Sequence, residues 1–308
     1  MIAPIDVLRE EYARGNLCLF VGAGVSAGCG LPAWQKLAEE VLGRIPREPY
    51  GNLPVEMVGR ARPLTGEIDP NWYFRYMKDI LGPIDPMQSM RYIRANKELD
   101  IAKLVRQCLY AREIHLTDVA LELPLLAKAR RICCFNYDDI LSRAFAEAGE
   151  SFTCLFPGDV IPLESSERLI FYPHGYLPDP EGAESSRATE NVVLSEEDYF
   201  ELYNSPYAWA NLVQIILLMN YTALFIGCSL ADPNLRRLLH ISSSRRPGHR
   251  HFAIMRNHHR APSGAWWMAQ QALAYEKLHG PLYKDLGVEI MWISDFPEIA
   301  SFLKNIRK

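Results

Sequence analysis

A glycine-rich turn near the amino terminus has the composition needed to bring backbone close to a phosphate group. Gly22, Gly24 and Ala27 directly follow the apolar run 17–21, Leu-Cys-Leu-Phe-Val. In such a turn the first glycine permits a sharp change of direction, and the second lets the backbone approach a pyrophosphate. A small third residue lets a helix pack on the strand, with its amino terminus facing the phosphates. The pattern predicts a dinucleotide-binding turn, with a purely structural turn as the alternative.

Hydride-transfer enzymes are disfavoured even if the turn binds a dinucleotide. Their second strand ends in an acidic residue about 20 residues after the turn, where it binds a ribose hydroxyl. Here that region is 46–49, Pro-Arg-Glu-Pro, and no predicted strand precedes it. The turn therefore indicates a dinucleotide but not a dehydrogenase.

Polar side chains follow two later apolar runs at the point where each run ends. Asn136 and Asp138 come after 131–135, and His174 comes after 168–172. Ligands of open parallel sheets bind outside the carboxyl ends of the strands. The Asn136 carboxamide suits a ribose hydroxyl or a water, and the His174 imidazole suits a general base near neutral pH.

These positions also have structural interpretations. Asp138 or Asp139 could cap the following helix, and we favour that role for Asp139. A fourth apolar run, 222–227, leads into Gly227 and Ser229, which could contact a ribose or an adenine. Asp232 followed by proline has the form of a helix start.

The elements that must position these residues alternate along the chain. Strands are expected near 17–21, 131–135, 152–155, 168–172, 222–227, 251–255 and 288–293. Helices are expected near 3–15, 34–42, 116–128, from about 139, and near 196–219, 233–241, 264–279 and 296–306. This alternation predicts an α/β fold, a Rossmann-like doubly wound and mostly parallel sheet. We expect one domain over 1–308 with a proline-rich helical insertion at about 43–112, and a mobile loop at 178–191.

Composition limits the partners. The chain has 308 residues, 49% hydrophobic and 23% charged, and a formal net charge of -4. We expect no direct nucleic-acid binding, since the arginine cluster 236–250 is favoured as a solvated face. The apolar stretch 212–227 is shorter than the ~20 residues of a membrane helix, so no membrane association is expected. Seven cysteines without a C-x-x-C pair predict no thiolate zinc site and a reducing cytoplasm.

Taken in order, the four motifs resemble the sirtuin (silent information regulator) superfamily. The resemblance is strongest to its bacterial branch with Asn-Tyr-Asp, here 136–138, and Ser-Leu-x-Asp-Pro-Asn, here 229–234. That branch includes NAD-depleting effectors of anti-phage defence. The resemblance implies NAD as substrate and Asn136 and His174 as the catalytic pair. It also implies that the NAD site is lined by Gly22, Ala23, Gly24, Ser26, Asp138, Gly227 and Ser229.

One departure from the family bears on activity. Protein-deacylating sirtuins carry a four-cysteine zinc module after the catalytic histidine, whereas here only Cys154 and Cys228 lie nearby. We therefore expect no metal, and an NAD hydrolase that releases nicotinamide and ADP-ribose or cyclic ADP-ribose. A deacylase and a non-catalytic NAD or ADP-ribose sensor are the alternatives. Because unregulated NAD loss harms the cell, we expect control by the 178–191 loop as a lid, by homo-oligomerisation, or by a regulatory protein such as an ATPase or phage-sensing subunit.

Overall fold

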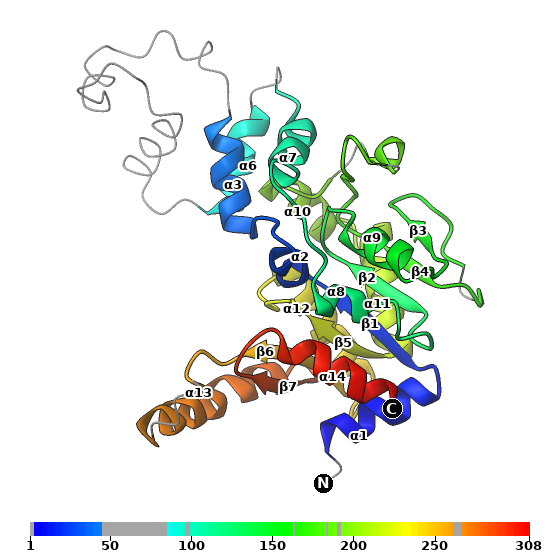
Figure 1. The fold of residues 1–308 in the computed structure, drawn as a ribbon, viewed down its shortest axis with the longest axis vertical. Coiled ribbons are helices and arrows are strands. Elements are labelled where there is room, and N and C mark those ends of the chain that lie inside the picture. Colours follow the sequence, from blue (N-terminus) through cyan, green and yellow to red (C-terminus); the bar gives the residue numbers. More distant parts are fainter. Residues whose placement is uncertain are drawn as a thin grey trace.

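The computed structural model describes residues 3–44, 85–95, 99–162, 164–182, 184–189, 192–260 and 266–308. Within them lies a parallel sheet of seven strands in the order β3-β4-β2-β1-β5-β6-β7 (Figure 1). The strands are β1 (Leu17–Val21), β2 (Arg131–Cys134), β3 (Thr153–Leu155), β4 (Leu169–Phe171), β5 (Thr222–Ile226), β6 (His251–Arg256) and β7 (Val288–Ile293). The predicted α/β class is confirmed.

The strand order identifies where a ligand would bind. Apart from edge strand β3, the sheet has the order 3-2-1-4-5-6 of dinucleotide-binding folds, with β1 as its first strand and β5 as its fourth. From β1 the chain adds β2 and β4 on one side of the sheet. It then crosses to the other side of β1, where it adds β5, β6 and β7. The switch point therefore lies between the carboxyl ends of β1 and β5.

Helices cover both faces of the sheet, as the continuous apolar run of β1 predicted. Leu17, Leu19 and Val21 face a core built with α1 (Pro4–Ala13), α8 (Asp118–Glu122), α9 (Ile140–Glu147) and α14 (Glu298–Arg307). Cys18 and Phe20 face the opposite core, built with α11 (Trp209–Asn220) and α12 (Pro233–Arg245). Because neighbouring residues point to opposite faces, a strand buried on both sides must be apolar throughout.

The register brings the predicted motifs to one edge. Val21 pairs with Cys134 on one side and with Ile226 on the other, and Cys133 pairs with Phe171. The segments that follow β1, β2, β4 and β5 therefore leave the sheet at the same level.

Three helices differ from the sequence predictions. A short helix α2 (Ala23–Gly28) begins immediately after Gly22, whereas the next helix was expected only at 34, where α3 (Trp34–Gly43) does begin. The single helix expected over 196–219 is two, α10 (Glu196–Asn204) and α11. Pro206 lies between them, and proline lacks the N–H that a continuous helix needs. The helix expected over 116–128 is confined to α8, with Pro124 just beyond it.

The predicted insertion is described in part. It contains α6 (Pro86–Ala95) and α7 (Ile101–Leu109), which pack with α3, while 45–84 and 96–98 lie outside the described residues. The Asp100 carboxylate caps α7 by accepting from the Lys103 N–H at 2.9 Å. Helix α13 (Trp266–Lys284) packs on β7 at the far edge of the sheet. Among the described helices, none has the length and apolar character required to cross a membrane.

Candidate active site

Three glycines form the contact between the ends of β1 and β5. The Gly22 N–H donates to the Ile226 carbonyl at 3.0 Å, and the Gly24 N–H donates to the Gly227 carbonyl at 2.9 Å. A Cβ atom on Gly24 would lie 2.8 Å from the Gly227 Cα, and Gly227 itself has a φ of +67°. The absence of side chains at these glycines therefore allows the close contact between the two turns. The exposed side of the turn, at Ala23 and Gly24, is open to a ligand.

Asn136 fastens the end of β2 to this turn. Its Nδ2 donates to the Gly22 carbonyl at 3.1 Å and to the Ser26 Oγ at 2.7 Å. The residue is 6% exposed, and its Oδ1 is buried without a hydrogen-bond partner in the described structure. The sequence predicted a carboxamide suited to a ribose hydroxyl or a water. Both donors are engaged, so Asn136 offers a ligand only its carbonyl oxygen, as an acceptor for a hydroxyl or a water.

Asp138 caps the following helix and contacts the same serine. Its Oδ1 accepts from the Ile140 N–H at 3.1 Å, and the Ser26 hydroxyl also hydrogen-bonds this carboxyl group. Burial raises the pKa of Asp138 to about 6, although these hydrogen bonds oppose the rise. Asp139 is the N-cap residue of α9, as we favoured, but its side chain makes no cap hydrogen bond and instead binds Arg143, with Oδ1 2.8 Å from Nε.

His174 is a buried, uncharged imidazole beside the end of β2. Its ring centroid lies 5.2 Å from that of Phe135 and 5.9 Å from that of Tyr199, and a ring N–H donates to the Phe135 carbonyl. Burial lowers the pKa of His174, and the negative charge of Asp232 opposes this effect. A neutral imidazole that donates with one nitrogen has its lone pair on the other, which is the form a general base needs.

Two residues near His174 were not predicted as part of a site. The Tyr199 hydroxyl donates to Asp232 Oδ2 at 3.0 Å, while Asp232 Oδ1 caps α12 by accepting from the Leu235 N–H at 2.9 Å. The cap was predicted, but no spacing in the sequence indicated that α10 would place Tyr199 between Asp232 and the imidazole.

The two predicted ligand contacts after β5 lie on an open turn. Gly227 is half-buried against the β1 turn, and Ser229 is exposed. The Ser229 Oγ accepts from the Ala231 N–H at 3.3 Å, and Leu230 between them has a φ of 54°. A left-handed conformation is costly for leucine, so the surrounding structure must hold this turn in place.

The segment that we expected to be a mobile loop, 178–191, is described in part. Its described parts, 178–182 and 184–189, include a short 3-10 helix, Ser185–Arg187. Their backbone accepts hydrogen bonds from the Arg106 side chain of α7 and donates one to Asp139, just before α9. Within the described ranges, no group of three or more His, Cys, Asp and Glu side chains could hold a metal ion.

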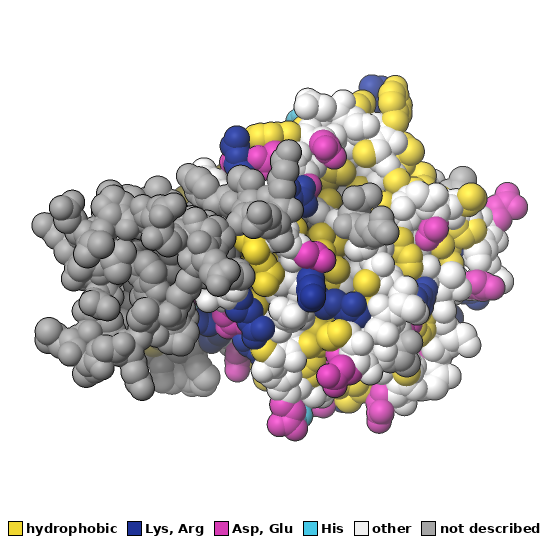
Figure 2. Space-filling model, turned by 90° about the horizontal axis from the view of Figure 1, so that it is seen from above, with side chains coloured by type: hydrophobic (Ala, Val, Ile, Leu, Met, Phe, Trp, Pro, Cys, Tyr) yellow, Lys and Arg dark blue, Asp and Glu magenta, His cyan; other side chains and the backbone are white. Residues whose placement is uncertain are grey.

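Charge on the face over this edge of the sheet is mixed. Figure 2 shows acidic side chains interspersed among the lysines and arginines of the described part of that face. Two arginines of the insertion are paired with acidic side chains, Arg91 with Glu197 at 2.7 Å and Arg112 with Glu40 at 2.5 Å. Nothing on this described surface forms a broad basic field of the kind that attracts nucleic acid.

Fold and site together define an α/β protein with the strand order of dinucleotide-binding folds and a buried histidine at the carboxyl edge of its sheet. Residues 130–275 match the family model for the SIR2-like domain. The family model that matches these residues is that of the superfamily which the motifs resemble, so the resemblance is confirmed.

Two curated relatives match over most of the chain. It is 23% identical over 239 residues to Defense-associated sirtuin 2 of Bacillus subtilis, covering 78% of this chain and 20% of that protein. It is 22% identical over 322 aligned positions to NAD(+) hydrolase ThsA of Enterococcus faecium, covering 99% of this chain and 58% of that protein. The chain thus spans about a fifth of the length of Defense-associated sirtuin 2 and somewhat over half of the length of ThsA.

Solved structures of Sir2 proteins are also similar. One, concerned with the mechanism and regulation of Sir2 enzymes, has a TM-score of 0.44 at 14% identity. The match covers 99% of this chain and 98% of the other chain. Another, a complex of a Sir2 homologue with NAD, has a TM-score of 0.41 at 13% identity. The match covers 98% of this chain and 93% of the other chain.

Proposed function

We propose that this chain hydrolyses NAD, releasing nicotinamide, and that it acts in anti-phage defence. The observation that carries the proposal is the arrangement at the end of β2. The Phe135 carbonyl accepts the His174 N–H, and the next residue, Asn136, has a buried carboxamide oxygen without a partner in the described structure. A neutral base is thus bonded to the residue that immediately precedes an unused buried acceptor. The names of the two curated relatives, a defence sirtuin and an NAD hydrolase, support the same activity.

In this proposal NAD lies across the switch point. The pyrophosphate lies on the exposed side of the glycine turn, and the nicotinamide ribose lies between Asn136 and His174. The proposed NAD contacts are the residues that the family resemblance implied, namely Gly22, Ala23, Gly24, Ser26, Asp138, Gly227 and Ser229. Ser26 and Asp138 also support the site indirectly, because Ser26 binds the Asn136 carboxamide.

The reaction breaks the bond between the ribose C1′ and the nicotinamide nitrogen. The bonding electrons leave with nicotinamide, which becomes neutral, and the ribose passes through an oxocarbenium-like state. A water hydrogen-bonded to the Asn136 oxygen attacks C1′, and His174 accepts its proton, giving ADP-ribose. If the adenine of the same molecule attacks instead, the product is cyclic ADP-ribose.

Chromatography of the products formed by the purified chain from NAD tests the proposal. A positioned general base contributes roughly 10²–10⁴-fold, so His174→Ala should lower turnover by about that factor while NAD binding is retained. An unchanged rate in His174→Ala would refute the role of the imidazole. Tight NAD binding without product in the parent chain would instead support a sensor. Nicotinamide release that requires an acyl-lysine peptide would support a deacylase.

Control by self-association or by a regulatory protein stays part of this proposal. Measuring NAD turnover against protein concentration tests the first of these. A rate per chain that is the same for the isolated monomer and at high concentration would contradict it.

A further inference from the structure

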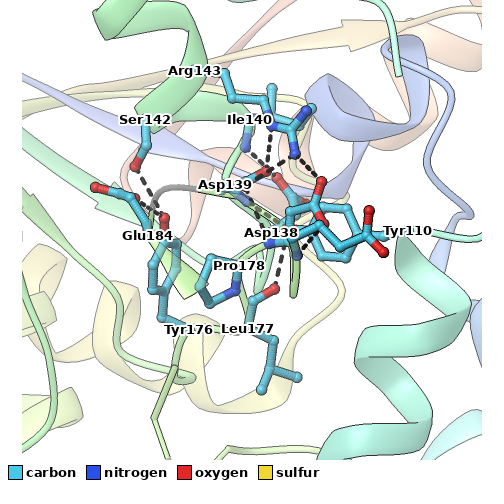
Figure 3. A network of polar contacts seen from close by, with 12 residues as sticks. Tyr110, Asp138, Asp139, Ile140, Ser142, Arg143, Tyr176, Leu177, Pro178 and Glu184 are labelled. Atoms are coloured by element: carbon cyan, nitrogen blue, oxygen red, sulfur yellow. Dashed lines mark hydrogen bonds and ion pairs between the residues drawn. The ribbon is translucent and has the colours of Figure 1, made fainter. Parts of the chain in front are cut away.

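One hydroxyl group joins the segments that follow the two proposed catalytic residues. Tyr110, at the end of α7, donates to the Leu177 carbonyl at 3.1 Å and accepts from the Asp139 N–H at 3.0 Å. Asp139 lies three residues after Asn136, and Leu177 lies three residues after His174. Figure 3 shows Tyr110 reaching both segments from the side of the insertion. A single group thus sets the spacing between two loops that leave neighbouring strands.

Arg106 holds the same segment one helical turn earlier on α7. Its Nη2 donates to the Asp179 carbonyl at 3.2 Å and to the Ser185 carbonyl at 3.1 Å, and its Nε donates to the Pro178 carbonyl. The guanidinium group is a planar fork with five N–H donors, so one side chain can bind several carbonyl groups at once.

Helix α9 holds the segment from the other side. Arg143 Nη2 lies 2.7 Å from Asp179 Oδ2, and its Nε lies 2.8 Å from Asp139 Oδ1. The Asp179 N–H also donates to Asp139 Oδ2 at 3.2 Å. The Leu177 N–H donates to the Tyr137 carbonyl at 2.6 Å. The start of the segment is therefore bonded to the β2 loop on one side and to α7 on the other.

The other described helix of the insertion, α6, contacts the start of α10, beyond the end of this segment. Arg91 of α6 lies 3.2 Å from Glu196, and Arg94 pairs with Asp198. Asp198 in turn accepts from the Ser195 N–H at 2.8 Å. The Val193 N–H donates to the His174 carbonyl at 2.9 Å. Helix α7 therefore contacts the segment that follows His174, whereas α6 contacts α10, whose capping residue Ser195 lies two residues after Val193.

We propose that Tyr110 and Arg106 are positioning residues that keep His174 in register with Asn136, so that the insertion controls the active site. The inference rests on the proposed NAD cleavage. Neither residue has to touch NAD, because each acts through the 177–185 segment. Any ligand or partner that displaced α7 would release this segment and shift the imidazole.

Tyr110→Phe is the sharpest test, because it removes one hydroxyl and keeps the ring. Misplacement of a catalytic group can cost up to about 10²-fold, so we expect kcat to fall by roughly 10–100-fold. The melting temperature should fall by no more than about 2–4 °C. Tyr275→Phe on α13 is the matched control, since its ring contacts Trp292 of β7 at the far edge of the sheet. It should leave kcat unchanged.

A double substitution separates positioning from general loss of structure. If Tyr110 acts through His174, Tyr110→Phe should cause no further loss of turnover in His174→Ala. A merely structural role would reduce the folded fraction equally in both backgrounds. Arg106→Lys keeps the charge but not the fork, and it should give a smaller fall in kcat of the same kind. Equal losses in both backgrounds would overturn the proposal.

Hydrogen exchange gives a measurement that does not depend on turnover. In Tyr110→Phe we expect faster amide exchange over 175–182, with exchange of β1 unchanged. If the parent chain releases no nicotinamide, the proposed function fails, and the exchange result still decides whether α7 holds the segment. Unchanged exchange over 175–182 together with unchanged kcat would overturn this inference but would leave the proposed function standing.

Discussion

The side-chain nitrogen of Asn136 lies 2.7 Å from the Ser26 hydroxyl and 3.1 Å from the Gly22 carbonyl. A residue proposed for chemistry at the end of β2 therefore also holds the turn at the end of β1. Ser26 connects both to Asp138, whose carboxyl group its hydroxyl also contacts. Substitutions at these positions should change both the stability of the chain and its affinity for NAD.

Asn136→Ala should reduce stability and weaken NAD binding. It removes the donor for two buried acceptors, and an unsatisfied buried polar group costs about 1–3 kcal/mol. Urea unfolding measures the first effect and calorimetry the second. Asn220→Ala is the control, because Asn220 donates its amide to the Ile216 carbonyl from an exposed position and should cost much less. Equal stability losses in the two variants would contradict the role of Asn136.

Gly24→Ala should destabilise the chain because a methyl group there has no room. Its Cβ would lie 2.8 Å from the Gly227 Cα, so the backbone must shift. Overpacking of this kind costs about 1–3 kcal/mol. At Gly280 no atom lies within 4 Å of an added Cβ, so Gly280→Ala should change stability by less than about 1 kcal/mol. Thermal unfolding compares the two variants, and an unaffected Gly24→Ala would mean that the strand ends do not touch.

Asp138 should make the stability of the chain fall as pH rises. Its pKa is about 6 in the folded chain, against an ordinary value of 3.8, so the folded state holds the proton more tightly. Its contribution is present below pH 3.8 and is lost as pH rises through 6. Asp138→Asn removes this titration. Between pH 4 and pH 7 the parent should lose on the order of 2–3 kcal/mol relative to the variant. Parallel stability curves in urea would contradict the assignment.

His174 should remain an active base below the pH at which an ordinary histidine becomes charged. Burial lowers its pKa from 6.5, so protonation, which removes the base, requires a more acidic solution. We expect the acid limb of kcat/KM to have its midpoint below pH 6.5. An NMR titration of the free chain, with the signal assigned from His174→Gln, measures the same group directly. A midpoint above 6.5 in that titration would rule out a desolvated imidazole.

Much of the fold could be predicted because its signals are local. The apolar run of β1 and the proline after Asp232 each specify a short piece of backbone, and the structure has both where they were expected. One difference arose where two neighbouring residues offer the same local signal. Asp138 and Asp139 are adjacent acids before one helix, and only the surrounding contacts determine which of them caps it.

The sequence alone determined that strands alternate with helices and that polar residues follow four strands. Strand and turn preferences act between residues that are close along the chain, so they can be inferred without the fold. Only the tertiary structure decided that the donors of Asn136 are bound to the glycine turn, that Tyr199 lies beside His174, and that Tyr110 joins the segments after Asn136 and His174. Each of these contacts depends on the order and register of the strands, which bring together groups that are far apart in the sequence.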